Sequence, residues 1–266
     1  MSTPVYTVQQ IRALEQAAIR QGIDGDAMMT RAGEAAFKSL LQYSLNINTL
    51  LLICGTGNNA GDAYVLAVCA KLHGLDVHIR YLDDPDDLKN EAQTAYQRAR
   101  QAGIEPQAFD PEEHIECDAI VDAILGIGLK GQVRAQALAA INWINIQHKF
   151  VLSIDIPSGL CATTGFPMPE AVYANLCTTF IGLKPGLLTG KAAEFVQKTI
   201  IHDLSLSQAI FDTAKPTIDK INANDFKHCL KPRLRNAHKT HFGHVLITGG
   251  YAGMSGAPLL SALAAA

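Results

Sequence analysis

The chain has 266 residues, of which 48% are apolar and 18% charged, and its formal net charge is −3 at pH 7. This length can bury the core of one α/β domain of about 200 to 250 residues, with a remnant left over. The small negative charge argues against a general nucleic-acid binder.

Two helices are predicted before the first strand. Thr7 can cap a helix over 8–21, and Ile11 and Leu14 fall on one face of that helix. A second helix fits 26–43.

Strand and helix patterns then alternate. The predicted strands cover 49–54, 76–82, 118–124, 149–155, 177–182 and 195–201. The helices between the early strands are predicted at 62–73, 86–102 and 134–147. Helices of this length between strands imply right-handed crossovers, so we predict a three-layer α/β/α Rossmann-like sandwich with a mostly parallel sheet and two N-terminal helices.

The compartment is indicated by the N-terminus and the cysteines. No basic stretch followed by an apolar one opens the chain, and no segment reaches about 18 uninterrupted apolar residues, so we expect a soluble protein without a membrane partner. Six cysteines without Cys-x-x-Cys spacing lie mostly in apolar runs, at positions 54, 69, 117, 161, 177 and 229. We predict buried free thiols and a cytoplasmic location.

The turn at 54–62, Cys-Gly-Thr-Gly-Asn-Asn-Ala-Gly-Asp, joins the first predicted strand to a helix. Its glycines let the backbone approach a phosphate, and the helix directs free N–H groups and its positive dipole end toward it. Asn58 and Asn59 add amide groups that can bind a ligand or a cation. The turn therefore predicts an anion site with room for further contacts.

Polar residues also follow the later strands. Ligands bind beyond the carboxyl ends of the strands in such sheets, so we expect one rim to hold Asn59, Asp122, Asp155, Ser158 and Lys184. Each residue also fits a structural role when it is taken alone. The aspartates can cap turns, the lysine can be a solvated loop residue, and the serine lacks a Gly-x-Ser-x-Gly surrounding. The coincidence of several strand-end motifs favours one pocket.

Together these motifs resemble the NAD(P)H-hydrate epimerase family, also called the YjeF N-terminal domain family. They are Cys-Gly-x-Gly-Asn-Asn-x-Gly-Asp at 54–62, Asp-Ala-x-x-Gly-x-Gly at 122–128, Asp-x-Pro-Ser-Gly at 155–159 and Phe-x-Gly-x-Lys-Pro-Gly at 180–186. Met-Met-Thr-Arg-Ala-Gly at 28–33 also resembles the family's N-terminal helical segment. The resemblance spans about residues 8 to 205.

The resemblance implies a K⁺ ion and a hydrated nicotinamide dinucleotide. The positions that match the ion's ligands are Asn59, Asp122 and Ser158, and oxygen donors of this kind suit a hard cation. The positions that match the dinucleotide site are Asn58, Asn59, Ala60, Gly61, Asp62, Gly126, Ile127, Gly128, Leu129, Lys130, Gly131, Gln132 and Asp155. The family usually has glycine at Ala60 and Ala63, and alanine would be strained there if either position required a positive φ.

The implied reaction is epimerisation at C6 of the hydrated nicotinamide ring, which interconverts the R and S forms of NADHX or NADPHX. It needs proton transfers and no redox cofactor. Our hypothesis assigns Asp155 as general base and Lys184 as general acid or electrostatic partner. Family members often self-associate, so a homo-oligomer is also an expectation.

The C-terminal segment 222–257 resembles the opening of the ADP-dependent NAD(P)H-hydrate dehydratase, a ribokinase-like domain fused behind the epimerase in many bacteria. We expect an epimerase domain over 1–215, a linker over 216–240 and a truncated start of the dehydratase over 241–266. The parent protein would then be bifunctional. This stub is expected to be poorly packed or docked on the first domain, without dehydratase activity.

Other functions remain open at this stage. The basic run at 227–244 lacks the interleaved aromatic residues of a stacking platform, so it indicates a linker and no nucleic-acid partner. A non-catalytic dinucleotide-binding module would show the same phosphate turn. A nicotinamide-dependent oxidoreductase is disfavoured, because the acidic residues after the second strand lie in a loop run typical of a protein surface.

Overall fold

The computed structural model describes residues 3–43, 46–129, 131–229, 235–238, 241 and 243–265. The chain divides into two compact units, Ser2–Ile221 and a second unit that comprises Met1 and Asn222–Ala266. All the predicted site residues belong to the first unit.

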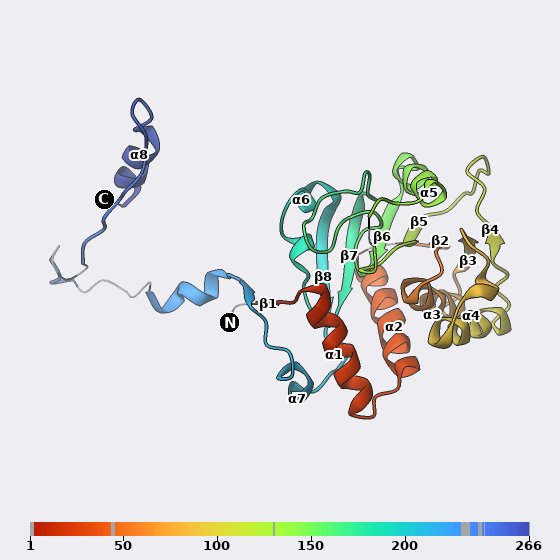
Figure 1. Ribbon diagram of the computed structural model, residues 1–266. Coiled ribbons are helices and arrows are strands. Elements are labelled where there is room, and N and C mark those ends of the chain that lie inside the picture. Colours follow the sequence, from red (N-terminus) through yellow and green to blue (C-terminus); the bar gives the residue numbers. More distant parts are fainter. Residues whose placement is uncertain are drawn as a thin grey trace. The chain divides into compact units, whose positions relative to one another are not determined.

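A seven-stranded sheet forms the centre of the first unit (Figure 1). In spatial order its strands are β4 (Gln107–Ala108), β3 (Asp76–Tyr81), β2 (Thr49–Cys54), β5 (Ala119–Ala123), β6 (Phe150–Ile154), β7 (Ala174–Phe180) and β8 (Val196–His202). Every neighbouring pair is parallel. The predicted α/β fold with six strands is confirmed, and the two-residue edge strand β4 is an addition.

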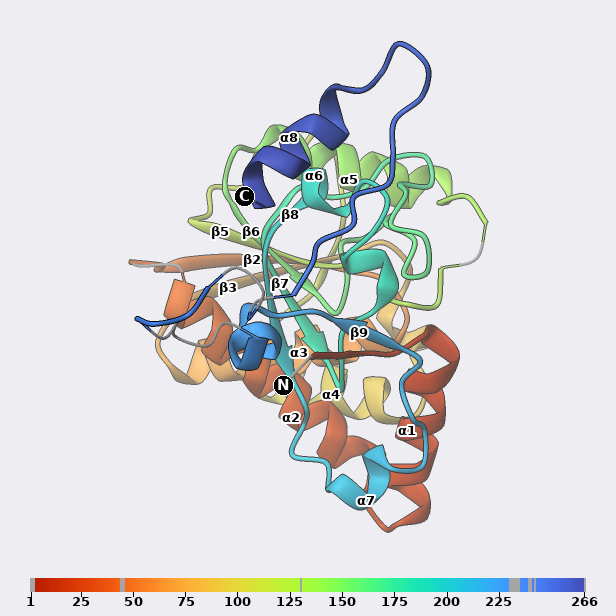
Figure 2. The same cartoon turned by 90° about the vertical axis from the view of Figure 1, so that its left-hand side faces the viewer.

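Helices cover both faces of this sheet. The helices of the first unit are α1 (Val8–Arg20), α2 (Gly25–Tyr43), α3 (Asn58–Leu72), α4 (Asn90–Gln101), α5 (Ala135–Ile146), α6 (Ala192–Phe195) and α7 (Gln208–Phe211). Leu50 and Leu52 of β2 pack into the core that α1 to α4 share, whereas Leu51 and Ile53 pack into the core under α5. Figure 2 shows α5 and the pair α2 and α3 on opposite sides of the sheet. This alternation produces the predicted three layers.

Helix α3 begins at Asn58, four residues before the predicted start at Asp62. Gly57 is its N-cap, with extended backbone angles, and the Gly57 carbonyl accepts hydrogen bonds from the N–H groups of Ala60 and Gly61. The predicted start is therefore wrong, because the Asn/Gly segment forms the first helical turn and not a loop before it. Ala60 and Ala63 lie within the helix without positive φ, so the strain that glycine would avoid does not arise.

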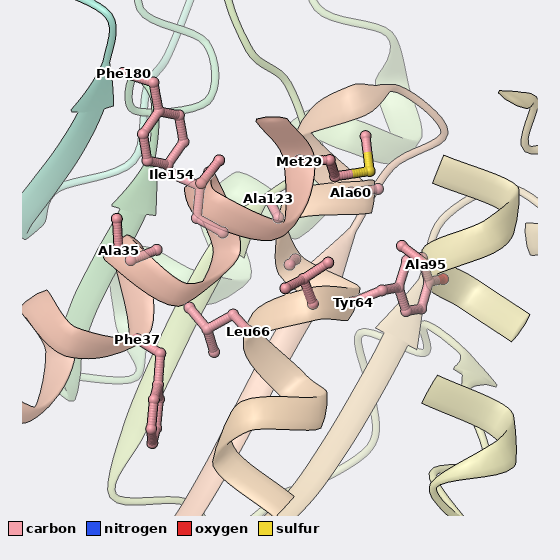
Figure 3. Packing of buried hydrophobic residues seen from close by; sticks show 14 of the residues in the cluster. Met29, Ala35, Phe37, Ala60, Tyr64, Leu66, Ala95, Ala123, Ile154 and Phe180 are labelled. Carbon is pink, nitrogen blue, oxygen red and sulfur yellow. The ribbon is translucent and has the colours of Figure 1, made fainter. Parts of the chain in front are cut away.

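The contact between α2 and α3 depends on small residues. A Cβ atom on Gly33 would lie 2.4 Å from Cβ of Val65, and one on Gly61 would lie 2.5 Å from Sδ of Met29. Fully buried Ala60 and Tyr64 continue this tight packing toward the sheet (Figure 3). The close approach holds the first turn of α3 against α2.

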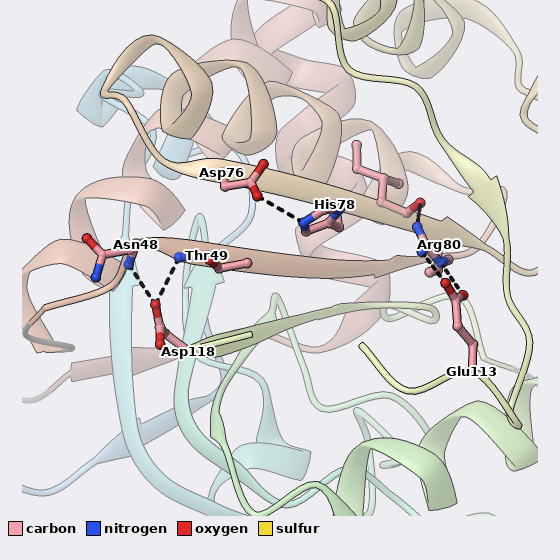
Figure 4. Close-up of polar contacts among 8 residues, drawn as sticks. Asn48, Thr49, Asp76, His78, Arg80, Glu113 and Asp118 are labelled. Carbon is pink, nitrogen blue, oxygen red and sulfur yellow. Dashed lines mark hydrogen bonds and ion pairs between the residues drawn. The ribbon is translucent and has the colours of Figure 1, made fainter. Parts of the chain in front are cut away.

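Two polar contacts connect strands of the sheet to neighbouring segments (Figure 4). Asp118 accepts hydrogen bonds from the N–H groups of Asn48 and Thr49, at 2.8 and 2.9 Å, and these bonds lower the pKa of its carboxyl. Arg80 forms a two-pronged ion pair with Glu113, at 2.9 and 2.8 Å. Both contacts lie away from the predicted site and contribute to the frame that carries it.

A second, two-stranded sheet pairs the beginning of the first unit with its end. β1 (Thr3–Val5) is antiparallel to β9 (Ile218–Lys220). This pairing places 218–220, which the sequence assigned to a linker, within the first unit.

The second unit contains η3 (Ala223–Cys229), a 3₁₀ helix, and α8 (Gly256–Ala265), in which no residue is buried. Within the described part of the chain, no helix has the length and apolar character needed to cross a membrane. Five of the cysteines are free thiols, as predicted, and Cys54, Cys117 and Cys177 are buried. The side chain of Cys229 lies outside the described residues.

Candidate active site

A cavity of about 730 Å³ lies at the carboxyl ends of the strands, a volume within the usual range for ligand sites. Its walls come from α1, α2, the start of α3 and the segments that follow β5, β6 and β7. The predicted site residues that line it are Asn58, Asn59, Asp62, Gly126, Ile127, Gly128, Leu129, Gln132, Asp155 and Lys184. The fold thus brings four separate sequence motifs to one cavity.

The other predicted residues lie elsewhere. Ala60 and Gly61 are buried in the α2–α3 contact, and Gly131 does not line the cavity. Asp122 and Ser158 are fully buried and lie outside the cavity lining. Lys130 lies outside the described residues.

An ion pair between Asp155 and Lys184 lies in the cavity wall. The lysine side chain is 1% exposed and the aspartate side chain 14% exposed. Nζ of Lys184 also donates to Oγ1 of Thr179 at 2.7 Å and to the carbonyl of Phe180 at 2.9 Å. Oδ1 of Asp155 receives the lysine, whereas Oδ2 has no hydrogen bond among the described residues.

The backbone is strained beside this ion pair. Asp155 has a φ of 66° and Ile181 a φ of 67°, the left-handed region that a β-branched residue rarely adopts. The N–H of Asp155 donates to the Thr178 carbonyl at 2.7 Å, and that of Ile181 donates to the His202 carbonyl at 2.7 Å. Strain held by such contacts is typical of functional sites.

Four more carboxyl groups line the same cavity, those of Asp83, Glu91, Asp62 on α3 and Glu15 on α1, and the last two interact with Asp155. Burial raises the pKa of both, and the nearby charge of Asp155 raises both further, while Lys184 opposes the rise. The pKa of Asp62 lies well above its usual value, and the charge of Glu15 contributes to that shift. The cavity therefore holds two carboxyl groups with raised pKa beside a buried ion pair, and perturbed groups of this kind are typical of functional sites.

Sequence reasoning missed the contribution of α1. Arg12 and Glu15 line the cavity, and Nη2 of Arg12 lies 4.0 Å from the position that a Cβ on Gly128 would take. The sequence does show that Glu15 shares a helix face with Ile11, four residues earlier, so a contact between this face and the rest of the domain could be expected. Nothing in the sequence placed that face over the strand ends.

A buried polar cluster lies around Asp122. Its carboxylate accepts hydrogen bonds from Oγ of Ser153 at 2.7 Å, and from N–H and Oγ of Ser158 at 2.8 and 2.5 Å. Desolvation nevertheless raises the pKa of Asp122, against the lowering effect of these bonds. The hydroxyl of Ser158 also accepts from the N–H of Leu125 at 2.8 Å, which ties the β5 and β6 segments together.

Asn59, in the first turn of α3, is buried without a hydrogen-bond partner. It is 9% exposed, and neither Oδ1 nor Nδ2 has a partner among the described residues. Buried amides in proteins are normally hydrogen-bonded, so an unpartnered one indicates a missing ligand or ion. No group of three or more His, Cys, Asp or Glu residues in the described ranges could hold a metal ion. A cation here would have to use neutral oxygens as well as a carboxylate.

The chain resembles curated repair enzymes from several bacteria. It is 38% identical to the "Bifunctional NAD(P)H-hydrate repair enzyme Nnr" of Coxiella burnetii, over 99% of this chain and 54% of that protein. It is 36% identical to the enzyme of the same name from Escherichia coli, over 95% of this chain and 49% of that protein. The chain thus spans about half the length of these relatives.

A solved structure shows the same fold, and a family model matches most of the first unit. The crystal structure of yeast ynu0 shares the fold with a TM-score of 0.69 at 16% identity, covering 82% of this chain and 95% of that one. Residues 25–186 match the family described as "YjeF-related protein N-terminus". The matched range begins after α1 and contains Asp62, Asp155 and Lys184. The chain therefore belongs to the YjeF-related N-terminal domain family.

Proposed function

We propose that this chain is an NAD(P)H-hydrate epimerase that interconverts the R and S forms of NADHX and NADPHX at C6 of the nicotinamide ring. The observation that carries the proposal is the Asp155–Lys184 ion pair in the wall of a cavity that also receives the start of α3. Relatives that match nearly the whole chain are named as NAD(P)H-hydrate repair enzymes, which supports this substrate class.

The start of α3 is suited to the pyrophosphate of the substrate. Gly57 caps the helix without a side-chain hydrogen bond, and the N–H groups of Asn58 and Asn59 have no acceptor among the described residues. Free N–H groups and the positive end of the helix dipole together stabilise an anion. Arg12 beside Gly128 adds a positive charge to the same cavity.

The residues around Asn59 fit a K⁺ ion. The unpartnered amide oxygen of Asn59 is a suitable ligand, and Asp122 and Ser158 supply further oxygen atoms. A bound K⁺ would balance the buried charge of Asp122 and hold the substrate phosphates beside α3. Replacing K⁺ with Na⁺ is expected to reduce the rate if these residues bind it.

The chemistry requires proton transfer only. The C6 carbon carries a hydroxyl and is bonded to the ring nitrogen N1. When the hydroxyl leaves as water, the N1 lone pair forms a C=N double bond, and water can then add to either face. The free Oδ2 of Asp155 is suited to accept a proton from the water that adds to C6. Lys184 holds Asp155 in place and stabilises its charge, so the electrostatic alternative for Lys184 is the one that the contacts favour.

Two substitutions test this assignment. Asp155→Asn removes the base, and Lys184→Ala leaves the carboxylate without its cation, so both are expected to slow epimerisation by roughly 10²-fold or more. Glu34→Gln on α2 changes one exposed charge and is the matched control. The R-to-S ratio of NADHX is followed by chromatography. Folded variants that stay within a few-fold of wild type would show that this pair is not catalytic.

The same assay separates the second candidate function. A non-catalytic dinucleotide-binding module would bind NADHX without changing its R-to-S ratio.

A further inference from the structure

Lys184 has no proton-donating group left for a substrate. A lysine ammonium has three N–H donors, and those of Lys184 face Asp155, Thr179 and the carbonyl of Phe180. Its side chain is 1% exposed. Loss of the C6 hydroxyl as water requires a proton donor, so a different group in the cavity must supply it.

We propose that Asp62 is that general acid: its carboxyl donates a proton to the C6 hydroxyl, which leaves as water. This inference rests on the epimerase function proposed above. The C6–O bond breaks as the C6–N1 double bond forms. A water molecule then adds to the opposite face of C6 and gives its proton to Asp155, and the reverse direction exchanges the two roles. Atoms and charges balance without an oxidant or a reductant, and proton exchange with solvent returns Asp62 and Asp155 to their starting states before the next turnover in the same direction.

The position of Asp62 supports this role. It lies on α3 one turn after Asn58 and Asn59, and all three side chains line the cavity. Its carboxyl has no hydrogen bond or ion pair among the described residues, although it is partly buried. A structural carboxylate at such a position is normally paired.

The surroundings of Asp62 favour its protonated form. The charged groups that face it are Asp155, Glu15 and Lys184. Burial is the main cause of its raised pKa, and the two carboxylates add to it more than the lysine subtracts. Asp155 differs because it has the ammonium group of Lys184 against Oδ1. Asp155 is thus paired with a cation and Asp62 is unpaired, which suits a base and an acid in one reaction.

Glu15 also lines the cavity, and its role in this proposal follows from its effect on Asp62. It reaches the cavity from α1, where Asp155, Lys184 and Arg12 influence its own ionisation. Its negative charge raises the pKa of Asp62. We therefore assign Glu15 as a positioning residue that extends the protonated range of Asp62 to higher pH.

Two variants of the full chain test the proposal. Asp62→Asn is expected to lower kcat for R-to-S conversion roughly 10²- to 10⁴-fold, with KM changed by less than threefold. Glu15→Gln is expected to retain activity at low pH but to move the alkaline limb of the kcat profile to lower pH. The direction follows because loss of the negative charge lowers the pKa of Asp62, so its proton is lost earlier as pH rises.

The control is again Glu34→Gln, and circular dichroism checks that each variant is folded. An Asp62→Asn protein that is folded and keeps kcat within threefold of an active wild type overturns the role of Asp62. An unmoved alkaline limb in Glu15→Gln overturns the role of Glu15, and this second readout stands even if Asp62→Asn does not fold. An inactive wild type overturns the proposed function itself, and this inference with it.

Discussion

At the scale of single residues, the site is built on buried groups that hold one another. Asp122 receives three short hydrogen bonds, yet its pKa is raised, because desolvation outweighs those bonds. Asp155 and Ile181 keep left-handed backbone angles beside the ion pair with Lys184. A desolvated carboxyl and a left-handed backbone each raise the free energy of the fold when taken alone, and the surrounding hydrogen bonds offset that increase.

Ser158 is the residue whose loss should disturb this cluster most. Ser158→Ala removes the hydroxyl that donates to Asp122 and accepts from the N–H of Leu125, so the buried carboxylate loses one of its hydrogen bonds and the Leu125 N–H loses its acceptor. The free energy of unfolding in urea should fall by about 1–3 kcal/mol. Ser207→Ala is the control, since Ser207 is exposed and its side chain forms no capping bond. A fall equal to the control's would mean that the cluster contributes no stability.

At the scale of elements, the order of strands and helices could be predicted from the sequence, but the residue at which α3 begins could not. Periodicity places β2 and its neighbours, since apolar strands between amphipathic helices have few alternative structures. The start of α3 was misplaced because Asn58 and Asn59 read as turn residues, whereas they form the first helical turn after the N-cap Gly57, and Gly61 in the same turn packs against Met29 of α2. The same packing turns Ala60 and Gly61 away from the cavity.

The α2–α3 contact gives a steric prediction. Gly33→Ala would place a Cβ 2.4 Å from Cβ of Val65 and 2.7 Å from the Asp62 carbonyl, so α2 and α3 must separate. Thermal or urea unfolding should show a loss of about 1–3 kcal/mol or more, with reduced epimerase activity because Asp62 shifts. Gly128→Ala is the matched control for stability, since the nearest atom to a Cβ there is 4.0 Å away and the residue has no positive φ. Equal stability of the two variants would contradict the close contact.

The end of α5 gives a prediction of increased stability. His148 follows the C-cap Gln147 with a φ of 52° and is exposed. His148→Gly should stabilise the fold by up to about 1 kcal/mol, because glycine adopts positive φ without steric cost. Gln147→Gly, at a φ of −72°, should instead destabilise it. Urea unfolding measures both, and a destabilised His148→Gly would refute the left-handed cap.

At the scale of the whole molecule, the first unit contains all the described groups that the mechanism uses. The pairing of β1 with β9 extends it to Ile221. The contribution of α1 to the cavity could not be predicted, because it depends on how this helix packs over the strand ends and not on its own periodicity. The strand-end motifs, in contrast, could be assembled from the sequence, since parallel strands deliver their carboxyl ends to one edge.

The division into two units predicts a pattern of proteolysis. No residue of α8 is buried, and Lys227 is exposed, so limited trypsin digestion should cut first at Lys227 or at later basic residues. Mass spectrometry should identify a resistant fragment that retains β9. Early cleavage within 8–202, at a rate equal to that beyond 221, would contradict the boundary at Ile221.

The central claim is that the cavity at Asp155 inverts C6 of hydrated nicotinamide dinucleotides. The most direct test follows the R-to-S ratio of pure R-NADHX by chromatography, with the full chain in K⁺ buffer, in Na⁺ buffer, and with no enzyme. We predict rapid approach to the R/S equilibrium in K⁺, a slower approach in Na⁺, and near loss of catalysis in Asp155→Asn. A ratio that changes in the presence of folded wild-type protein no faster than in buffer alone would contradict the account.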